Sequence, residues 1–177
     1  MYNYWRTDLN DSIKALESIK NTVLPYLISG EIYSIEKSQN EILILMDTLS
    51  GIDYVRKNKD GLQGIAARVQ WANKPYNTFT IRSSRTSGVD TELKKRLFQI
   101  NNGYFYPAFT LQAYFDNRID NKLLSIGIMR TKDLYNLYLN EPSKFKKNKS
   151  DNDFIFISWD SIDPKLIKTK IRKAIYH

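Results

Sequence analysis

The sequence predicts an α+β protein in which a central mixed or antiparallel sheet is flanked by helices. Segments with helical spacing of apolar residues come before, between and after segments in which apolar and polar residues alternate. The chain has 177 residues, of which 42% are hydrophobic and 13% aromatic, so it is long enough to bury a core. Without an internal repeat or a linker-like stretch, residues 1–177 are expected to form one domain.

Two helices are predicted before the first strand. Residues 11–24 have apolar side chains at helical spacing, and Pro25 stops or bends that helix. Residues 36–50 are expected to form the second helix, with Gly51 well placed as its C-terminal cap. The buried face of this second helix is predicted to consist of Ile42, Leu45, Met46 and Leu49.

Three consecutive strands are predicted next, and they are expected to pair as an antiparallel meander. They cover residues 52–56, 64–71 and 77–83. Alternation puts Ile65, Ala67, Val69 and Trp71 on one face of the second strand, and Phe79 and Ile81 on one face of the third. The rest of the chain alternates between helices and strands. The predicted elements are helix 90–101, strands 106–115 and 123–130, helix 132–139, a mobile basic loop near 140–153, strand 154–159 and helix 164–175. In helix 90–101, Leu93, Leu97 and Ile100 are expected to face inward.

Two residue types that carry much enzyme chemistry are almost missing. The chain has no cysteine, which excludes disulfides, thiolate metal sites and a cysteine nucleophile. The only histidine is His177, the last residue, which excludes a histidine-based triad, a zinc site with several histidines and an HNH-type nuclease centre. Any catalysis must therefore depend on carboxylates, lysine, tyrosine or metal-bound water.

The net charge of +8 favours contact with polyanions, and nucleic acid is the expected partner. The alternative is a lysine-rich surface that only keeps the protein in solution. No apolar run approaches the ~20 residues that are needed to cross a bilayer. The first residues lack the basic start and apolar core of a secretory signal. The sequence therefore predicts a soluble, cytoplasmic protein.

One acidic residue and a short polar row stand on neighbouring predicted strands. Asp53 begins the first of these strands, and Arg68 and Gln70 share one face of the next because strand side chains alternate. Mg²⁺ prefers one or two carboxylates plus waters and phosphate oxygens, so Asp53 is a candidate ligand, with Glu41 or Glu36 as the second. The alternative is that Asp53 only pairs with Arg68 across a hairpin.

The order of a helix, a strand with Asp53, a strand with a polar row and another helix resembles the core of the PD-(D/E)XK nucleases, which have the restriction-endonuclease-like fold. The resemblance covers roughly residues 36–115. Arg68-Val69-Gln70 stands where the family has (D/E)-x-K, so a cation replaces the acid and an amide replaces the lysine. Some family members place an essential residue on the following helix, where Glu92 or Lys94 could serve. The resemblance implies Mg²⁺-dependent hydrolysis of DNA phosphodiesters, with Asp53, Arg68, Gln70 and Glu92 as catalytic residues and Asp53 and Glu41 as metal ligands.

A second candidate site is the basic stretch 78–96. Two arginines flank a Ser/Thr/Gly loop that leads into a helix, whose positive end attracts anions. The residues expected to contact the phosphate backbone are Arg82, Arg85, Lys94, Lys95 and Arg96. The alternative is a capped helix with solvated basic residues.

Gln112 is a polar residue among apolar neighbours in strand 106–115. Alternation puts it on one face with Thr110 and Tyr114, and that face could line a cleft. The alternative is a structural amide, since buried amides are normally hydrogen-bonded.

These observations support two main hypotheses. The first is a metal-dependent nuclease that acts on DNA. The second is a protein on the same scaffold that binds nucleic acid or inhibits host defence without catalysis, of the kind that a phage or mobile element would carry. A structural protein that presents a tyrosine-rich sheet is a third hypothesis. A homodimer and a complex with a host protein are both compatible with the second and third hypotheses.

Overall fold

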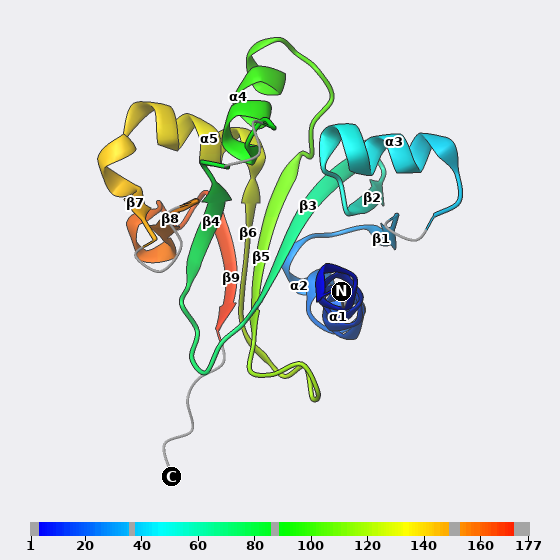
Figure 1. Cartoon of the computed structure of the whole chain (residues 1–177). Helices are drawn as coiled ribbons and strands as arrows, with labels where there is room; N and C mark the ends of the chain where they lie inside the picture. Colours follow the sequence, from blue (N-terminus) through cyan, green and yellow to red (C-terminus); the bar gives the residue numbers. More distant parts are fainter. Residues whose placement is uncertain (1–3, 36–37, 86–88, 149–152, 172–177) are drawn as a thin grey trace.

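In the computed structural model, a six-stranded mixed sheet occupies the centre of the molecule and a three-stranded sheet lies against one of its faces (Figure 1). The structure describes residues 4–35, 38–85, 89–148 and 153–171. The helices are α1 (Tyr4–Lys20), α2 (Leu24–Leu27), α3 (Glu41–Ser50), α4 (Glu92–Asn101) and α5 (Thr131–Asn140), with short 3-10 turns η1 (Pro142–Lys144) and η2 (Trp159–Ser161). The strands are β1 (Glu31–Ser34), β2 (Tyr54–Asn58), β3 (Gly61–Trp71), β4 (Thr78–Arg82), β5 (Phe109–Phe115), β6 (Leu123–Arg130), β7 (Lys146–Lys147), β8 (Phe154–Ser158) and β9 (Ile167–Ile171). The predicted α+β class with a mixed sheet is confirmed.

The large sheet has the strand order β1-β2-β3-β5-β6-β9. All neighbours are antiparallel except β3 and β5, which run parallel and are connected through β4 and α4. The predicted meander of 52–56, 64–71 and 77–83 is therefore wrong in its third strand. β4 leaves the large sheet and pairs with β8 in the second sheet, whose order is β4-β8-β7. The edge of β3 is thus free for β5, and the backbone groups of β4 are satisfied by a strand 70 or so residues further along the chain.

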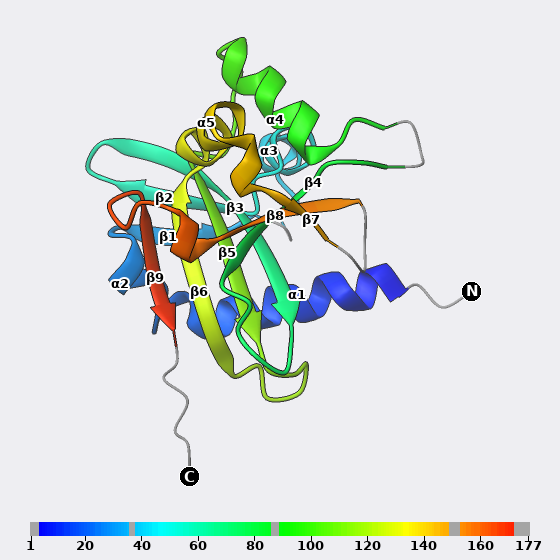
Figure 2. The same cartoon turned by 90° about the vertical axis from the view of Figure 1, so that its left-hand side faces the viewer.

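One face of the large sheet is apolar and is covered by α1 and α2. Figure 2 shows α1 lying across the strands. The predicted alternation of β3 is confirmed, because Ile65 is buried and Ala67, Val69 and Trp71 pack against the same core. Leu16 and Ile19 of α1 belong to that core as well. The hydrophobic effect therefore fixes which face of β3 points towards α1.

The opposite face is covered by the second sheet together with α4 and α5. Phe79 and Ile81 of β4 are buried there, as their alternation predicted. Leu93, Leu97 and Ile100 give α4 the inward face that was expected from helical spacing. Thr91 caps α4, since its side chain accepts a hydrogen bond from the Lys94 amide.

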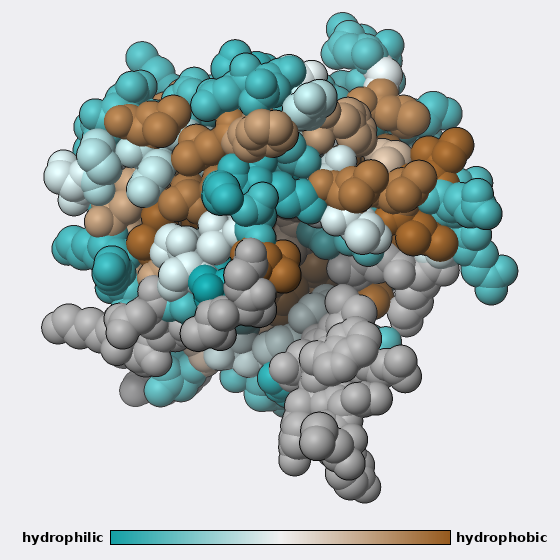
Figure 3. All heavy atoms as spheres, turned by 45° about the horizontal axis from the view of Figure 1, so that its top comes forward, coloured by the Kyte–Doolittle hydropathy of each residue, from teal (hydrophilic) through white to brown (hydrophobic). Residues whose placement is uncertain are grey.

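The helix α3 lies over the β1–β2 edge of the large sheet and is largely exposed. Its predicted end is confirmed, because Gly51 adopts the left-handed conformation with φ of 60°. The predicted buried face is wrong: Ile42, Leu45 and Leu49 are 68%, 53% and 60% exposed, and only Met46 of that set packs inward. Figure 3 shows apolar side chains gathered on the side of the molecule where α3 lies. The small cluster beneath α3 accommodates only a narrow stripe of the helix, so a uniformly apolar helix leaves most of its side chains outside.

Three other predictions differ from the structure. The helix predicted at 11–24 starts earlier, at Tyr4, and ends at Lys20, and Pro25 is the second residue of the separate turn α2. The predicted basic helix 164–175 contains the strand β9, which pairs with β6 at the sheet edge; residues 172–177 lie outside the described residues. Alternating lysines are typical of such an edge, because they discourage further pairing. The loop 140–153 contains η1 and β7, while residues 149–152 also lie outside the described residues.

Candidate functional site

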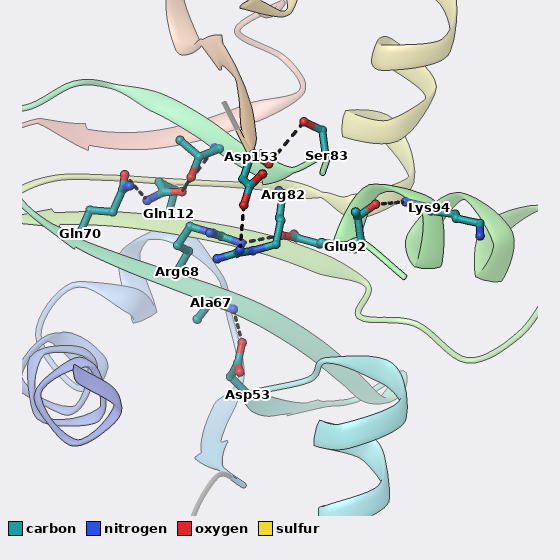
Figure 4. A network of polar contacts seen from close by, with 12 residues as sticks. Asp53, Ala67, Arg68, Gln70, Arg82, Ser83, Glu92, Lys94, Gln112 and Asp153 are labelled. Carbon is teal, nitrogen blue, oxygen red and sulfur yellow. Dashed lines mark hydrogen bonds and ion pairs between the residues drawn. The ribbon is translucent and has the colours of Figure 1, made fainter. Parts of the chain in front are cut away.

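The second face of β3 carries the polar row that the sequence predicted, and this row is enclosed between the two sheets. Arg68 and Gln70 point towards β4, and their register partners on β5 are Gln112 and Tyr114. The parallel pairing of β3 with β5 therefore brings two polar rows side by side. Facing them are hydroxyl-bearing side chains of β4 and the carboxylate of Glu92 on α4 (Figure 4).

An ion pair closes one end of this polar layer. Arg68 Nη2 donates to Glu92 Oε2 at 2.5 Å, and both side chains are mostly shielded from solvent. Glu92 also accepts from the Arg82 amide at 3.3 Å and from the Tyr135 hydroxyl at 3.4 Å. Glu92 thus joins β3, β4 and α5. Burial, and next to it the Glu92 charge, raise the pKa of Tyr135 well above its usual value.

Arg82 lies at the same end of the polar layer and contacts a carboxylate and an aromatic ring. Its guanidinium lies 3.9 Å from the Asp153 carboxylate and 4.5 Å above the Phe154 ring. Arg68 approaches the same ring at 4.9 Å. Both cations are thus held by a carboxylate and an aromatic face. Arg85 is exposed, at the start of the segment 86–88 that lies outside the described residues.

Asp53 lies away from this cluster. Its Oδ2 accepts from the backbone amide of Ala67 at 2.5 Å, just beyond the last residue pair of β2 and β3. Figure 4 shows Asp53 on one side of β3 and the Arg68, Arg82 and Glu92 side chains on the other. The alternative that Asp53 pairs with Arg68 across the hairpin is wrong, because Arg68 lies on the other side of β3 and pairs with Glu92 there. The carboxylate instead satisfies a strand amide where the ladder ends.

Among the described residues, no group of three or more His, Cys, Asp or Glu side chains is placed to hold a metal ion. Glu41 is the first residue of α3, and the side-chain oxygen of Gln70 accepts a hydrogen bond from the side-chain amide of Gln112. Glu36 lies outside the described residues.

The basic residues of α4 are used in different ways. Lys94 pairs with Asp90 at 2.7 Å on the surface. Lys95 donates to the Thr48 carbonyl at 3.0 Å, and burial lowers its pKa. Arg96 is buried and donates to the Ser50 carbonyl and to Gln99, so it holds the end of α3 against α4 and does not reach solvent as a phosphate contact.

The other end of the polar layer is a chain of amides and hydroxyls. Gln112 is buried, accepts from Thr80 Oγ1 at 2.9 Å and donates to Gln70 at 3.2 Å. The Tyr114 hydroxyl is 2.6 Å from the Thr78 hydroxyl, and burial raises the pKa of Tyr114. Gln112 is therefore a satisfied structural amide. Of the face that it was predicted to share, Tyr114 lines a cleft, whereas Thr110 and Gln112 are not among the lining residues.

This cleft has a volume of about 830 Å³. Gln70, Thr78, Thr80 and Tyr114 form its polar wall. Aromatic rings and three cations also line it, and no carboxylate occurs among its described lining residues. The aromatic residues are Trp71, Tyr76 and Phe156, and the cations are Arg118, Lys146 and Lys147. The cleft can accept a ligand that combines negative charge with flat apolar surface.

The three cations of the cleft are not equivalent. Arg118 lies 3.2 Å from Asp11 and 4.4 Å above the Trp71 ring, so it is already paired. Lys146 and Lys147 are exposed and make no ion pair within the described residues. Sequence reasoning noted these lysines only as part of a basic loop, and it missed Arg118 and Tyr76. The alternation of Gln70 and Gln112 was the signal that pointed to this place.

Comparison of the chain with models of protein families, with curated proteins and with solved structures finds no match. Among the described residues, no helix is both long and apolar enough to cross a membrane.

Proposed function

We propose that the protein binds nucleic acid in the cleft between its two sheets, without metal-dependent hydrolysis centred on Asp53. The observation that carries this proposal is the lining of the cleft, where cations and aromatic rings occur together and the described lining residues include no carboxylate. Phosphates need the cations, and bases need the rings. Asp53 contributes to the fold through its bond to the Ala67 amide.

Lys146 and Lys147 are the phosphate contacts in this proposal. Both are exposed, both belong to the edge strand β7, and neither has an ion-pair partner within the described residues. Their charges are thus available to neutralise phosphates and release counterions, which is the main source of sequence-independent affinity. Arg118 contributes less, because Asp11 already neutralises it.

Tyr76 is the stacking residue. Its side chain is 54% exposed, and its ring lies 6.0 Å from that of Tyr114 and 5.8 Å from the Lys74 ammonium. An exposed ring at the mouth of a basic cleft offers a flat surface to any base, since stacking does not depend on base identity. The proposed ligand is therefore single-stranded, because only unpaired bases expose their faces.

The test is fluorescence anisotropy with a labelled single-stranded oligonucleotide over a series of salt concentrations. The double variant Lys146→Gln, Lys147→Gln should weaken binding for all sequences and make the salt slope shallower by about one to two. Tyr76→Ala should cost about 1–3 kcal/mol of binding free energy and leave the salt slope unchanged. These two results separate phosphate contact from stacking.

The matched control removes the same charge elsewhere. Lys57→Gln, Lys59→Gln neutralises two exposed lysines near the β2–β3 turn, which do not line the cleft. That control should change affinity and salt slope by much less than the cleft variant. Equal effects of both pairs would show that net charge, and not the cleft, governs binding, and the proposal would fail.

A metal-dependent nuclease is the second candidate, and one observation favours it. The helix α3, Asp53, the strand β3 with its polar row, and the helix α4 follow each other in the order that characterises the PD-(D/E)XK core. If this candidate is right, the protein cleaves DNA with Mg²⁺ or Mn²⁺, and Asp53→Ala abolishes cleavage while circular dichroism remains native. Binding without turnover in both metals would exclude it.

A further inference from the structure

A second cavity, of about 450 Å³, shares no lining residue with the cleft. It lies where the start of β5 and the end of β6 meet α2 and the segment before β9. Four cations and one carboxylate are among its lining residues: Arg56, Arg130, Lys165, Lys168 and Asp133. The excess of positive charge makes this cavity electrostatically suited to an anion.

Arg56 is the unusual member of this set, because its side chain is only 8% exposed and has no carboxylate partner within the described residues. Its Nη1 donates to Gln63 at 2.8 Å, its Nη2 donates to the Ser29 hydroxyl at 2.9 Å, and its Nε donates to the Ser29 carbonyl. The guanidinium also lies 5.6 Å from the centre of the Phe109 ring. All these partners are neutral, so a buried charge remains uncompensated.

A guanidinium has five N–H donors, of which these bonds use three. The neutral acceptors fix the plane of the group and leave two donors for a ligand that enters the cavity. A buried charge without a counter-charge is costly, and an oxyanion on the free donors would supply the missing charge. A preoriented arginine of this kind is well suited to the geometry of a phosphate.

The other cations of the cavity come from the end of β6 and from β9 with the segment before it. Arg130, Lys165 and Lys168 are exposed and form no ion pair within the described residues. Arg130 is also the N-cap residue of α5 and gives that helix no side-chain cap. The positive end of a ten-residue helix therefore adds to the field of the side chains. Among the described lining residues, Asp133 is the only carboxylate, and it offsets one of the four cations.

We propose that this cavity is a binding site for a terminal phosphate group, held by Arg56 at the back and by Lys165 and Lys168 at the mouth. A dianionic phosphate matches the excess of cations better than a singly charged carboxylate does. A concave site of this volume accepts a chain end or a small molecule, whereas the internal phosphodiesters of a duplex do not enter it. The phosphate could belong to a free small molecule or to the 5′ end of a nucleic-acid strand.

The first test is titration of the full chain with inorganic phosphate at constant ionic strength, followed by NMR of the arginine Nε–H signals and by calorimetry. We expect saturable binding that shifts the Arg56 Nε–H signal, whereas acetate at the same ionic strength gives no saturable shift. Arg56→Gln should weaken phosphate binding roughly tenfold or more, because a charge-assisted contact is lost. Lys165→Gln, Lys168→Gln changes only exposed residues, keeps the fold, and should weaken binding about three- to tenfold.

The control variant is Lys57→Gln, the neighbour of Arg56 on β2, whose exposed side chain does not line the cavity. It should bind phosphate as the wild type does. A comparison of one oligonucleotide with and without a 5′-phosphate then separates the two sources. A gain in affinity that is lost in the Lys165, Lys168 variant identifies a strand end, and no gain identifies a small molecule.

Two results would overturn the proposal: no saturable response to inorganic phosphate, or a response that survives both the Arg56 and the lysine variants. The inference does not depend on nucleic-acid binding in the cleft. The Lys146, Lys147 variant should retain phosphate binding here, so that either proposal can fail while the other holds.

Discussion

The two faces of β3 contribute to the structure in different ways, although the same eleven residues form both. Towards α1 the face is apolar, and Ile65 and its neighbours contribute to a continuous core. Towards β4 the face is polar, and Arg68 and Gln70 join an enclosed network of ion pairs and amides. The apolar face gains its energy from area removed from water. The polar face gains little net energy but requires specific partners, since each unpaired buried group is costly.

The largest effect should come from the apolar face. Leu111 on β5 is 1% exposed and packs in the core beneath α1. Leu111→Ala should lower the free energy of unfolding by about 2–5 kcal/mol, because it removes buried methyl groups and leaves a cavity. Urea denaturation followed by circular dichroism measures the loss. Leu62→Ala, at a side chain that is 69% exposed on β3, should stay within about 0.5 kcal/mol. Comparable losses at both positions would contradict the proposed core.

The apolar face was also the part that could be predicted from the sequence. Alternation in β3 and β4 and helical spacing in α4 correctly identified Ile65, Phe79, Ile81 and Leu97 as inward-facing. These patterns are local, because a strand or helix has a fixed period whatever it packs against. The same logic failed for α3, where apolar residues occur on all sides and the pattern does not say which of them are buried.

Which strands pair with each other could not be predicted, because the pairing depends on the topology of the whole chain. The turn after β3 looks like a further hairpin, yet β4 pairs with β8 and leaves β3 to β5. That rearrangement places Glu92 on Arg68 and separates both from Asp53. The strand β9 was missed because its basic, weakly periodic sequence also fits a helix. In the candidate site, the spacing of Arg68 and Gln70 indicated a shared face, but nothing local indicated Arg118 or Tyr76.

An intermediate effect should come from the ion pair on the polar face. Glu92→Gln should destabilise the protein by about 1–3 kcal/mol, because it weakens the acceptor of Arg68 and of the Arg82 amide. A double-mutant cycle with Arg68→Met should give a coupling energy of about 0.5–3 kcal/mol, as the double variant leaves no unpaired charge.

The matched control for that cycle is the exposed pair formed by Lys94 of α4 and Asp90, which lies just before that helix. Its cycle, with Lys94→Met and Asp90→Asn, should give a coupling energy below about 0.5 kcal/mol. Equal coupling energies in the two cycles would mean that the enclosed network is no more specific than a surface pair, and the contrast between the two faces of β3 would then be weaker than described.

The smallest effect on stability should appear only at alkaline pH. It should come from Tyr135, which lies between the polar layer and the core around α5. Tyr135 is buried, and its hydroxyl reaches Glu92 at 3.4 Å. Burial, followed by the Glu92 charge, raises the pKa of Tyr135 well above 10.0, while in the unfolded chain it titrates near that value. Above pH 10 the unfolded state therefore binds fewer protons than the folded state. The stability that is fully present below pH 10 should fall by up to about 1.4 kcal/mol per pH unit until the folded pKa is reached.

The measurement compares urea denaturation of wild type and Tyr135→Phe from pH 8 to about pH 11. The difference in stability between the two proteins should be constant below pH 10 and shift in favour of Tyr135→Phe above it, since effects of lysines and other tyrosines cancel. A difference that stays constant to the end of the range would show that Tyr135 titrates alike in both states, and its hydroxyl would then not be shielded between α4 and α5.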